Sequence, residues 1–123
     1  DNEDRRRDAS EKLQSYLISQ RMDDPVIVLG DYNDDINGKT YETNVFYNLA
    51  SSASDYLFTD MEIALGSPKY WSYPSYPSHI DHILITDELF SNVDTTMVLM
   101  PDKCYPGYRY TVSDHRPVEI ILK

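Results

Sequence analysis

A short apolar run, Val26–Leu29, leads directly into the polar sequence Gly30-Asp31-Tyr32-Asn33. The length of the run and its β-branched residues are typical of a strand that is covered on both faces. Every second side chain of a strand shares a face, so Asp31 continues one apolar face, and a chain that stays extended adds Asn33 to it. The sequence therefore predicts a strand that ends in an acid and an amide.

Two further segments join apolar strand residues to Asp and His, namely Ser78-His79-Ile80-Asp81-His82-Ile83-Leu84-Ile85 and Val112-Ser113-Asp114-His115-Arg116-Pro117-Val118. If the three strand ends converge, three carboxylates, one amide and one imidazole meet at one rim. Carboxylate and amide oxygens suit Mg²⁺, and an imidazole oriented by a carboxylate can act as acid, base or oxyanion stabiliser. This combination of side chains predicts metal-assisted hydrolysis of a phosphoester, whose charge requires a cation.

Each motif alone also has a simpler structural explanation. Gly-Asp-x-Asn after a strand is often an Asx turn, and Ser113-Asp114-His115 are acceptable turn residues. His79 and His82 are more often structural than ligands, and a zinc site on them is disfavoured because residues three apart on a strand face opposite sides. The joint occurrence of the three motifs is what favours a phosphate-handling site.

Composition limits the partners of the chain. With 11 Lys and Arg against 21 Asp and Glu, the formal net charge of −10 repels polyanions at long range. The single cysteine, Cys104, excludes an internal disulfide, and no apolar run approaches the ~20 residues of a membrane span. We expect a soluble chain without a membrane span, and its compartment stays open.

Apolar periodicity and turn residues predict an alternation of helices and strands. We expect an amphipathic first helix with Leu13, Tyr16 and Leu17 inward, and a second helix with Val45 and Leu49 inward. The long segment 66–78, with three prolines and four aromatic residues, is expected to be a functional loop. The expected helices are 4–21, 41–52 and 59–65, and the expected strands after 26–29 are 80–85, 93–100 and 117–122.

The motifs Gly30-Asp31-Tyr32-Asn33, Ile80-Asp81-His82-Ile83-Leu84 and Ser113-Asp114-His115-Arg116-Pro117-Val118 resemble the closing motifs of the endonuclease/exonuclease/phosphatase superfamily, the DNase-I-like fold. The resemblance covers nearly the whole chain. It implies a four-layer α/β sandwich of two mixed sheets with helices outside, and phosphoester cleavage with Mg²⁺ or Mn²⁺. The fold class implied for this chain is α/β (α+β): half of that sandwich, with one mixed sheet and helices on one face.

The resemblance also implies a role for each motif residue. Asp31 and Asn33 would contact the scissile phosphate and the attacking water or metal, with Asp31 activating the water. His115 would bind a non-bridging phosphate oxygen, Asp81 would buttress His115, and Asp114 would be a metal ligand, directly or through water. The number of metal ions and the identity of the general base stay open.

The aromatic residues of the 66–78 loop are candidates for substrate binding, above all Trp71 and Tyr76, with Tyr70 and Tyr73 beside them. They either stack on a substrate or simply pack the loop. The substrate class is open among nucleic acid, nucleotide and phosphorylated small molecule. The inositol phosphatase branch is disfavoured, because its middle motif is Cys-Asp-Arg where this chain has Ile80-Asp81-His82.

The resemblance further implies an N-terminal half with a Glu metal ligand, which has no counterpart in these residues. We therefore expect residues 1–123 to be the C-terminal portion of the domain, to hold one of its two sheets, and to be inactive alone. The apolar face of Ile27, Leu29, Ile83 and Ile85 would lie open until the other half or a second copy covers it. The alternative is a non-catalytic binding or scaffolding module that retains the fold.

Overall fold

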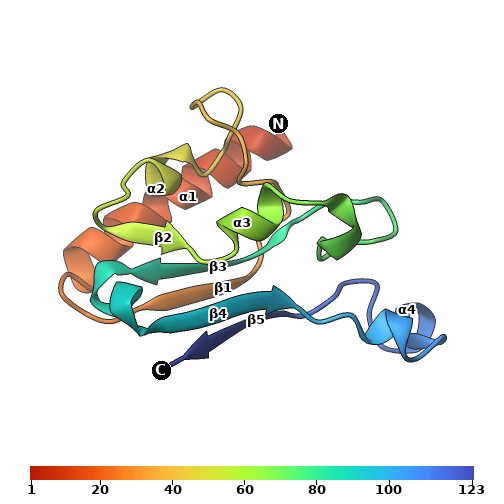
Figure 1. Ribbon diagram of the computed structural model, residues 1–123. Coiled ribbons are helices and arrows are strands. Elements are labelled where there is room, and N and C mark those ends of the chain that lie inside the picture. Colours follow the sequence, from red (N-terminus) through yellow and green to blue (C-terminus); the bar gives the residue numbers. More distant parts are fainter.

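A computed structural model describes all 123 residues as an α+β protein with two antiparallel sheets (Figure 1). The expected α+β class is confirmed. Three short 3-10 helices, at Pro68–Tyr70, Asp87–Asn92 and Pro101–Lys103, lie in the connections. The helices and strands are α1 (Asn2–Gln20), β1 (Ile27–Asp31), α2 (Tyr47–Ala50), β2 (Tyr56–Phe58), α3 (Met61–Ala64), β3 (Asp81–Thr86), β4 (Val93–Val98), α4 (Tyr108–Thr111) and β5 (Val118–Leu122).

The strands form a three-stranded sheet in the order β1-β3-β2 and a two-stranded sheet of β4 and β5. All strand pairs are antiparallel, so the chain carries strands of two antiparallel sheets where one mixed sheet was expected. In the β1–β3 register Leu29 lies opposite Ile83, and Asp31 lies opposite Asp81. The register therefore places two of the predicted acids side by side at one end of the sheet.

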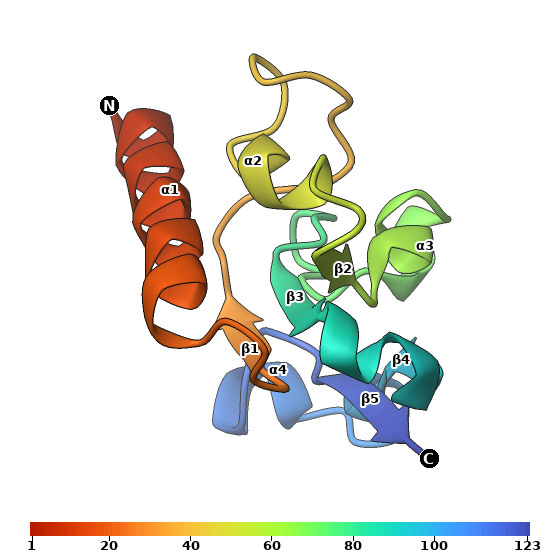
Figure 2. The ribbon, with the colours of Figure 1, turned by 90° about the vertical axis from the view of Figure 1, so that its left-hand side faces the viewer.

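Helices α1, α2 and α3 lie on one side of the three-stranded sheet, and β4 with β5 lies on the other (Figure 2). Helices on one face of this sheet are thus as expected. The main core lies between the helices and the sheet, and includes Leu17 of α1, Leu49 of α2, Phe58 of β2 and Leu84 of β3. Apolar burial on the helix side therefore fixes the strands whose ends carry the motifs.

Helix α1 starts at a capping residue and packs on the core through a narrow apolar face. The Asp1 carboxylate accepts hydrogen bonds from the backbone N–H groups of Glu3 and Asp4, which satisfies two donors that a helix start leaves free. Most of the helix is polar, and Leu17 is its buried apolar residue. Tyr16 was expected to point inward, but it is 46% exposed and its hydroxyl accepts a hydrogen bond from Arg21. The apolar face of α1 is therefore narrower than the spacing of its apolar residues predicted.

The second helix is shorter than predicted, because a side chain holds the residues before it in turns. The Asn44 amide donates to the carbonyls of Ile36 and Gly38, and its oxygen accepts from the Phe46 N–H. These bonds compete with helical backbone bonds, so α2 begins only at Tyr47. The predicted burial of Val45 and Leu49 is confirmed. The predicted helix at 59–65 is present as α3.

Strand β2 was not predicted, because its three residues carry too little pattern. It makes β3 the central strand of its sheet. Ile83 and Ile85 were expected on an open face but are only 3% and 0% exposed, and that expectation was wrong for them. The second sheet lies over this face of β3, where Val118 of β5 and Ile83 line one cavity.

The same face of β1 remains open. Leu29 is 67% exposed and Ile27 is 37% exposed, as the prediction of an uncovered apolar face requires. No helix of the structure combines the length and apolar character that a membrane span needs. Of the four apolar residues expected on an open face, the two in β1 are therefore the ones that remain exposed.

Replacing Leu84 by Ala tests this arrangement. Leu84 is 1% exposed, so its loss should lower the free energy of unfolding by about 2–5 kcal/mol. The matched control, Leu29→Ala, should cost about 0.5 kcal/mol or less because Leu29 stands in solvent. Urea unfolding of both variants measures the difference. Equal losses of unfolding free energy in the two variants would show that another surface covers Leu29 on β1.

Candidate functional site

Three segments meet at the end of the sheet where β1 stops and β3 starts. Asp31 is the last residue of β1, Asp81 is the first residue of β3, and His115 lies in the turn before β5. The carboxylate oxygens of the two acids and a ring nitrogen of His115 all lie within 4.8 Å of one another. The structure thus brings together one residue from each of the three motifs.

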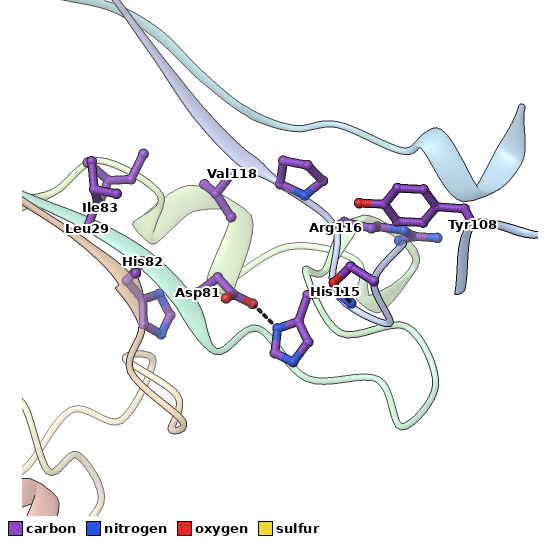
Figure 3. Close-up of a pocket in the computed structure, with 11 residues that line it drawn as sticks. Leu29, Asp81, His82, Ile83, Tyr108, His115, Arg116 and Val118 are labelled. Carbon is purple, nitrogen blue, oxygen red and sulfur yellow. Dashed lines mark hydrogen bonds and ion pairs between the residues drawn. The ribbon is translucent and has the colours of Figure 1, made fainter. Parts of the chain in front are cut away.

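Asp81 and His115 form the most defined contact of this group. The Asp81 Oδ2 and the His115 Nδ1 are 2.8 Å apart, and both side chains are partly buried (Figure 3). Partial burial opposes a charged ring. The hydrogen bond and charge of Asp81, with the charges of Asp31 and Asp114, outweigh it and raise the pKa of His115. The imidazolium is therefore favoured, and its hydrogen bond to the protein is made by Nδ1.

Asp31 faces this rim and also forms a turn with Asn33. The Asp31 Oδ1 accepts the backbone N–H of Asn33 at 2.8 Å, which is the Asx turn that the motif alone indicates. Asn33 has a φ of 55°, so the chain leaves the extended conformation and the strand alternation assumed for Asn33 does not hold. Both side chains are exposed, and each is accessible to a ligand.

The other predicted site residues lie further from this group. Asp114 is exposed and contributes its charge to His115 without joining the Asp31, Asp81 and His115 cluster. The Trp71 indole donates to the Ile63 carbonyl at 3.0 Å, so it packs its loop against α3. Tyr76 is 78% exposed. Tyr73 is the loop residue that meets the site, with its ring 5.0 Å from that of His115.

A cavity of about 280 Å³ opens beside the Asp81–His115 pair. Figure 3 shows Leu29 and Ile83 together at one end of it, His115 toward the other, and Val118 above Asp81 between them. Tyr108, which belongs to none of the three motifs, also lines it. The cavity therefore has a polar end, where the motif residues lie, and an apolar end on the open face of β1.

Arg116 fixes the turn that carries His115. It is 4% exposed and forms two 2.9 Å bonds to the carboxylate of Asp102, whose pKa this pairing lowers. Its guanidinium also donates to the carbonyls of Lys69 and Trp71. The aromatic loop and the Ser-Asp-His turn are therefore held together by one buried cation.

A second polar cluster is fully buried behind the rim. The Asp60 Oδ2 lies 2.8 Å from the His79 Nε2 and 2.6 Å from the His82 Nδ1, and the Asp60 Oδ1 accepts the Ile83 N–H at 2.9 Å. The expectation that the two rings face opposite sides was wrong. His79 precedes β3, so strand alternation does not apply to it, and the ring centroids are 5.1 Å apart.

Asp60 itself was missed by sequence reasoning. An Asp before a short helix is typical of an N-cap, but this side chain makes no cap bond and turns inward to the imidazoles. Burial opposes its charge, but hydrogen bonds from His79 and His82, the charge of His82 and the Ile83 N–H lower its pKa to about 2. Asp60 is therefore a buried carboxylate at neutral pH.

The sequence model of the endonuclease/exonuclease/phosphatase family matches residues 1–115. The chain belongs to this family. No curated protein matches the sequence closely enough to add a relative. The endonuclease/exonuclease/phosphatase family hydrolyses phosphoester bonds and typically depends on a divalent metal, and the acids and histidines described above are groups that can bind one.

The buried Asp60 predicts a loss of stability in acid. Its folded-state pKa of about 2 lies below its ordinary value of 3.8, so its contribution is complete above about pH 5 and is lost as the pH falls toward 2. The shift corresponds to about 2 kcal/mol. The difference in free energy of unfolding between the wild type and Asp60→Asn, measured across this range, should shrink with falling pH. A difference that does not change with pH would contradict the assignment.

Proposed function

We propose that this protein is a metal-dependent phosphoesterase that uses Mg²⁺ or Mn²⁺, with its reaction centre at Asp31, Asp81 and His115. The observation that carries the proposal is the convergence of these three groups, each from a different segment, within 4.8 Å. Family membership supplies the reaction class. We assign the activity to the complete domain of the full-length protein.

The donor set beside His115 fits a hard divalent cation. Asp81 is engaged by His115, so Asp31 and the nearby Asp114 are the carboxylates that we assign to the metal, directly or through water. The amide oxygen of Asn33 adds a further neutral oxygen donor to metal or phosphate. A bound cation would neutralise phosphate charge in a protein whose net charge is −10.

His115 is the residue that we assign to the phosphate. Its Nδ1 is held by Asp81, which fixes the ring and leaves Nε2 as the free donor. An Nε2–H group directed at a non-bridging oxygen stabilises the charge that develops on that oxygen in the transition state. We assign to Asp31, which is exposed at the end of β1, the acceptance of a proton from an attacking water.

The surroundings of His115 favour a phosphoester with a modest organic group. The cavity of about 280 Å³ and the rings of Tyr73 and Tyr108 can receive a planar or apolar group beside the phosphate. We propose Tyr76, which is exposed in the 66–78 loop, as a further substrate contact, while Trp71 holds that loop against α3. A panel of DNA, nucleotide and inositol phosphate substrates distinguishes nuclease from phosphatase activity.

Replacing His115 by Ala should abolish most of the activity. Loss of one transition-state donor lowers kcat by about 100-fold or more. The measurement is Mg²⁺-dependent release of phosphate or alcohol by the full-length protein. The Tm of the variant serves as the control for folding. Unchanged kcat in a folded His115→Ala variant would exclude this residue from the reaction.

Metal affinity should depend on Asp31. Asp31→Asn removes one carboxylate from the proposed metal site and should weaken Mn²⁺ binding, measured by electron paramagnetic resonance, by about 10-fold or more. The matched control is Asp94→Asn, an exposed strand aspartate in the other sheet. Equal Mn²⁺ affinities in the two variants would place the metal elsewhere.

A further inference from the structure

A continuous network of buried hydrogen bonds lies behind the three site segments. Its two centres are Asp60 and Ser72, and both residues are 0% exposed. Neither residue lines the cavity beside His115 or belongs to the three motifs. From these centres the hydrogen bonds reach the loop after β1, the start of β3 and the turn before β5.

One branch leads from Asp60 to the loop after β1. The Asp60 carboxylate contacts the His82 Nδ1, and the His82 Nε2 lies 2.8 Å from the Asp34 carbonyl oxygen. Asp34 directly follows Asn33, and its own carboxylate is held by Arg6 of α1 at 2.9 Å. The chain that follows Asp31 and Asn33 is thus fixed from the interior by an imidazole and from the outside by a guanidinium.

The other branch leads from Asp60 through His79 to Ser72. The His79 Nδ1 accepts the Ser72 N–H, and the Ser72 Oγ accepts the backbone N–H groups of Ile80 and Asp81, both at 3.2 Å. The Ser72 carbonyl accepts the Arg116 N–H at 2.6 Å. One buried serine therefore binds the backbone at Asp81 and the backbone next to His115.

We propose that Ser72 and Asp60 are positioning residues of this active site, and that Ser72 sets the distance between Asp81 and His115. This inference rests on the proposed phosphoesterase function. Buried hydrogen bonds hold their partners tightly because an unmade bond in the interior is costly. A displacement of reacting groups by about 1 Å can lower a rate about 100-fold, so a residue that touches no substrate can control kcat.

Thr86 provides a matched control for Ser72. It lies at the opposite end of β3 and is 7% exposed. Its Oγ1 accepts the Val26 N–H and donates to the Asp24 carbonyl, both at 3.0 Å. Thr86 therefore uses a buried hydroxyl to join β3 to the residues just before β1, as Ser72 uses one to join the aromatic loop to the start of β3. Its loss should cost stability without moving Asp81.

The first measurement compares Ser72→Ala with Thr86→Ala in the full-length protein. Ser72→Ala should lower kcat about 10- to 100-fold, with a much smaller change in KM, because substrate contacts remain while the reacting groups shift. Thr86→Ala should lower the Tm but leave kcat within about 2-fold of the wild type. If Ser72→Ala does not fold, Ser72→Cys takes its place, since its sulfur is a weaker acceptor at the same position. Equal kcat values in the Ser72 and Thr86 variants would overturn the proposal.

The second measurement does not depend on activity. The His115 Nδ1 proton, shared with Asp81, should give a downfield NMR signal in the wild type and in Thr86→Ala, and should shift or broaden in the folded Ser72 variant. An unchanged signal in that variant would overturn the positioning role. If the wild type hydrolyses no phosphoester, the function proposal fails by itself, and the NMR comparison still decides whether Ser72 positions the pair.

Discussion

The carboxylate of Asp60 is the interaction on which the rest of this structure depends. It is fully buried, and it accepts hydrogen bonds from two imidazoles and one backbone N–H at the start of the central strand. A buried charge is tolerated only when its partners are in place, so strand β3, the loop after β1 and the aromatic loop must form together. The site in front of this network consequently has a defined geometry before any ligand binds.

The sequence predicted the parts of the site that depend on local pattern. Asp31, Asp81 and His115 each follow or precede an apolar strand, which local pattern shows, whereas the antiparallel register that brings Asp31 opposite Asp81 comes from the structure. The mixture of helices and strands followed from apolar periodicity, and the α+β class from the resemblance to the family. Local pattern was also sufficient for the burial of Val45 and Leu49, although only Leu49 lies in a helix, because α2 is shorter than predicted.

The remaining features depend on contacts between distant residues. Asp60 reaches imidazoles 19 and 22 residues away, and Ser72 reaches Arg116 across the chain, so no short window contains their partners. The burial of Ile83 and Ile85 required the second sheet, whose placement strand periodicity cannot give. Asn33 departs from alternation because the side chain of Asp31 bonds its backbone, a competition that a strand pattern ignores.

The most direct measurement of the central claim is a crystal structure of the full-length protein with Mn²⁺ and a non-hydrolysable phosphoester analogue. The account predicts a metal ion on the Asp31 and Asp114 side of the rim, and a phosphate oxygen within hydrogen-bond distance of the His115 Nε2. Asp81 should still hold the Nδ1 of the same ring. A metal and phosphate bound away from these residues, with His115 facing solvent, would contradict the account.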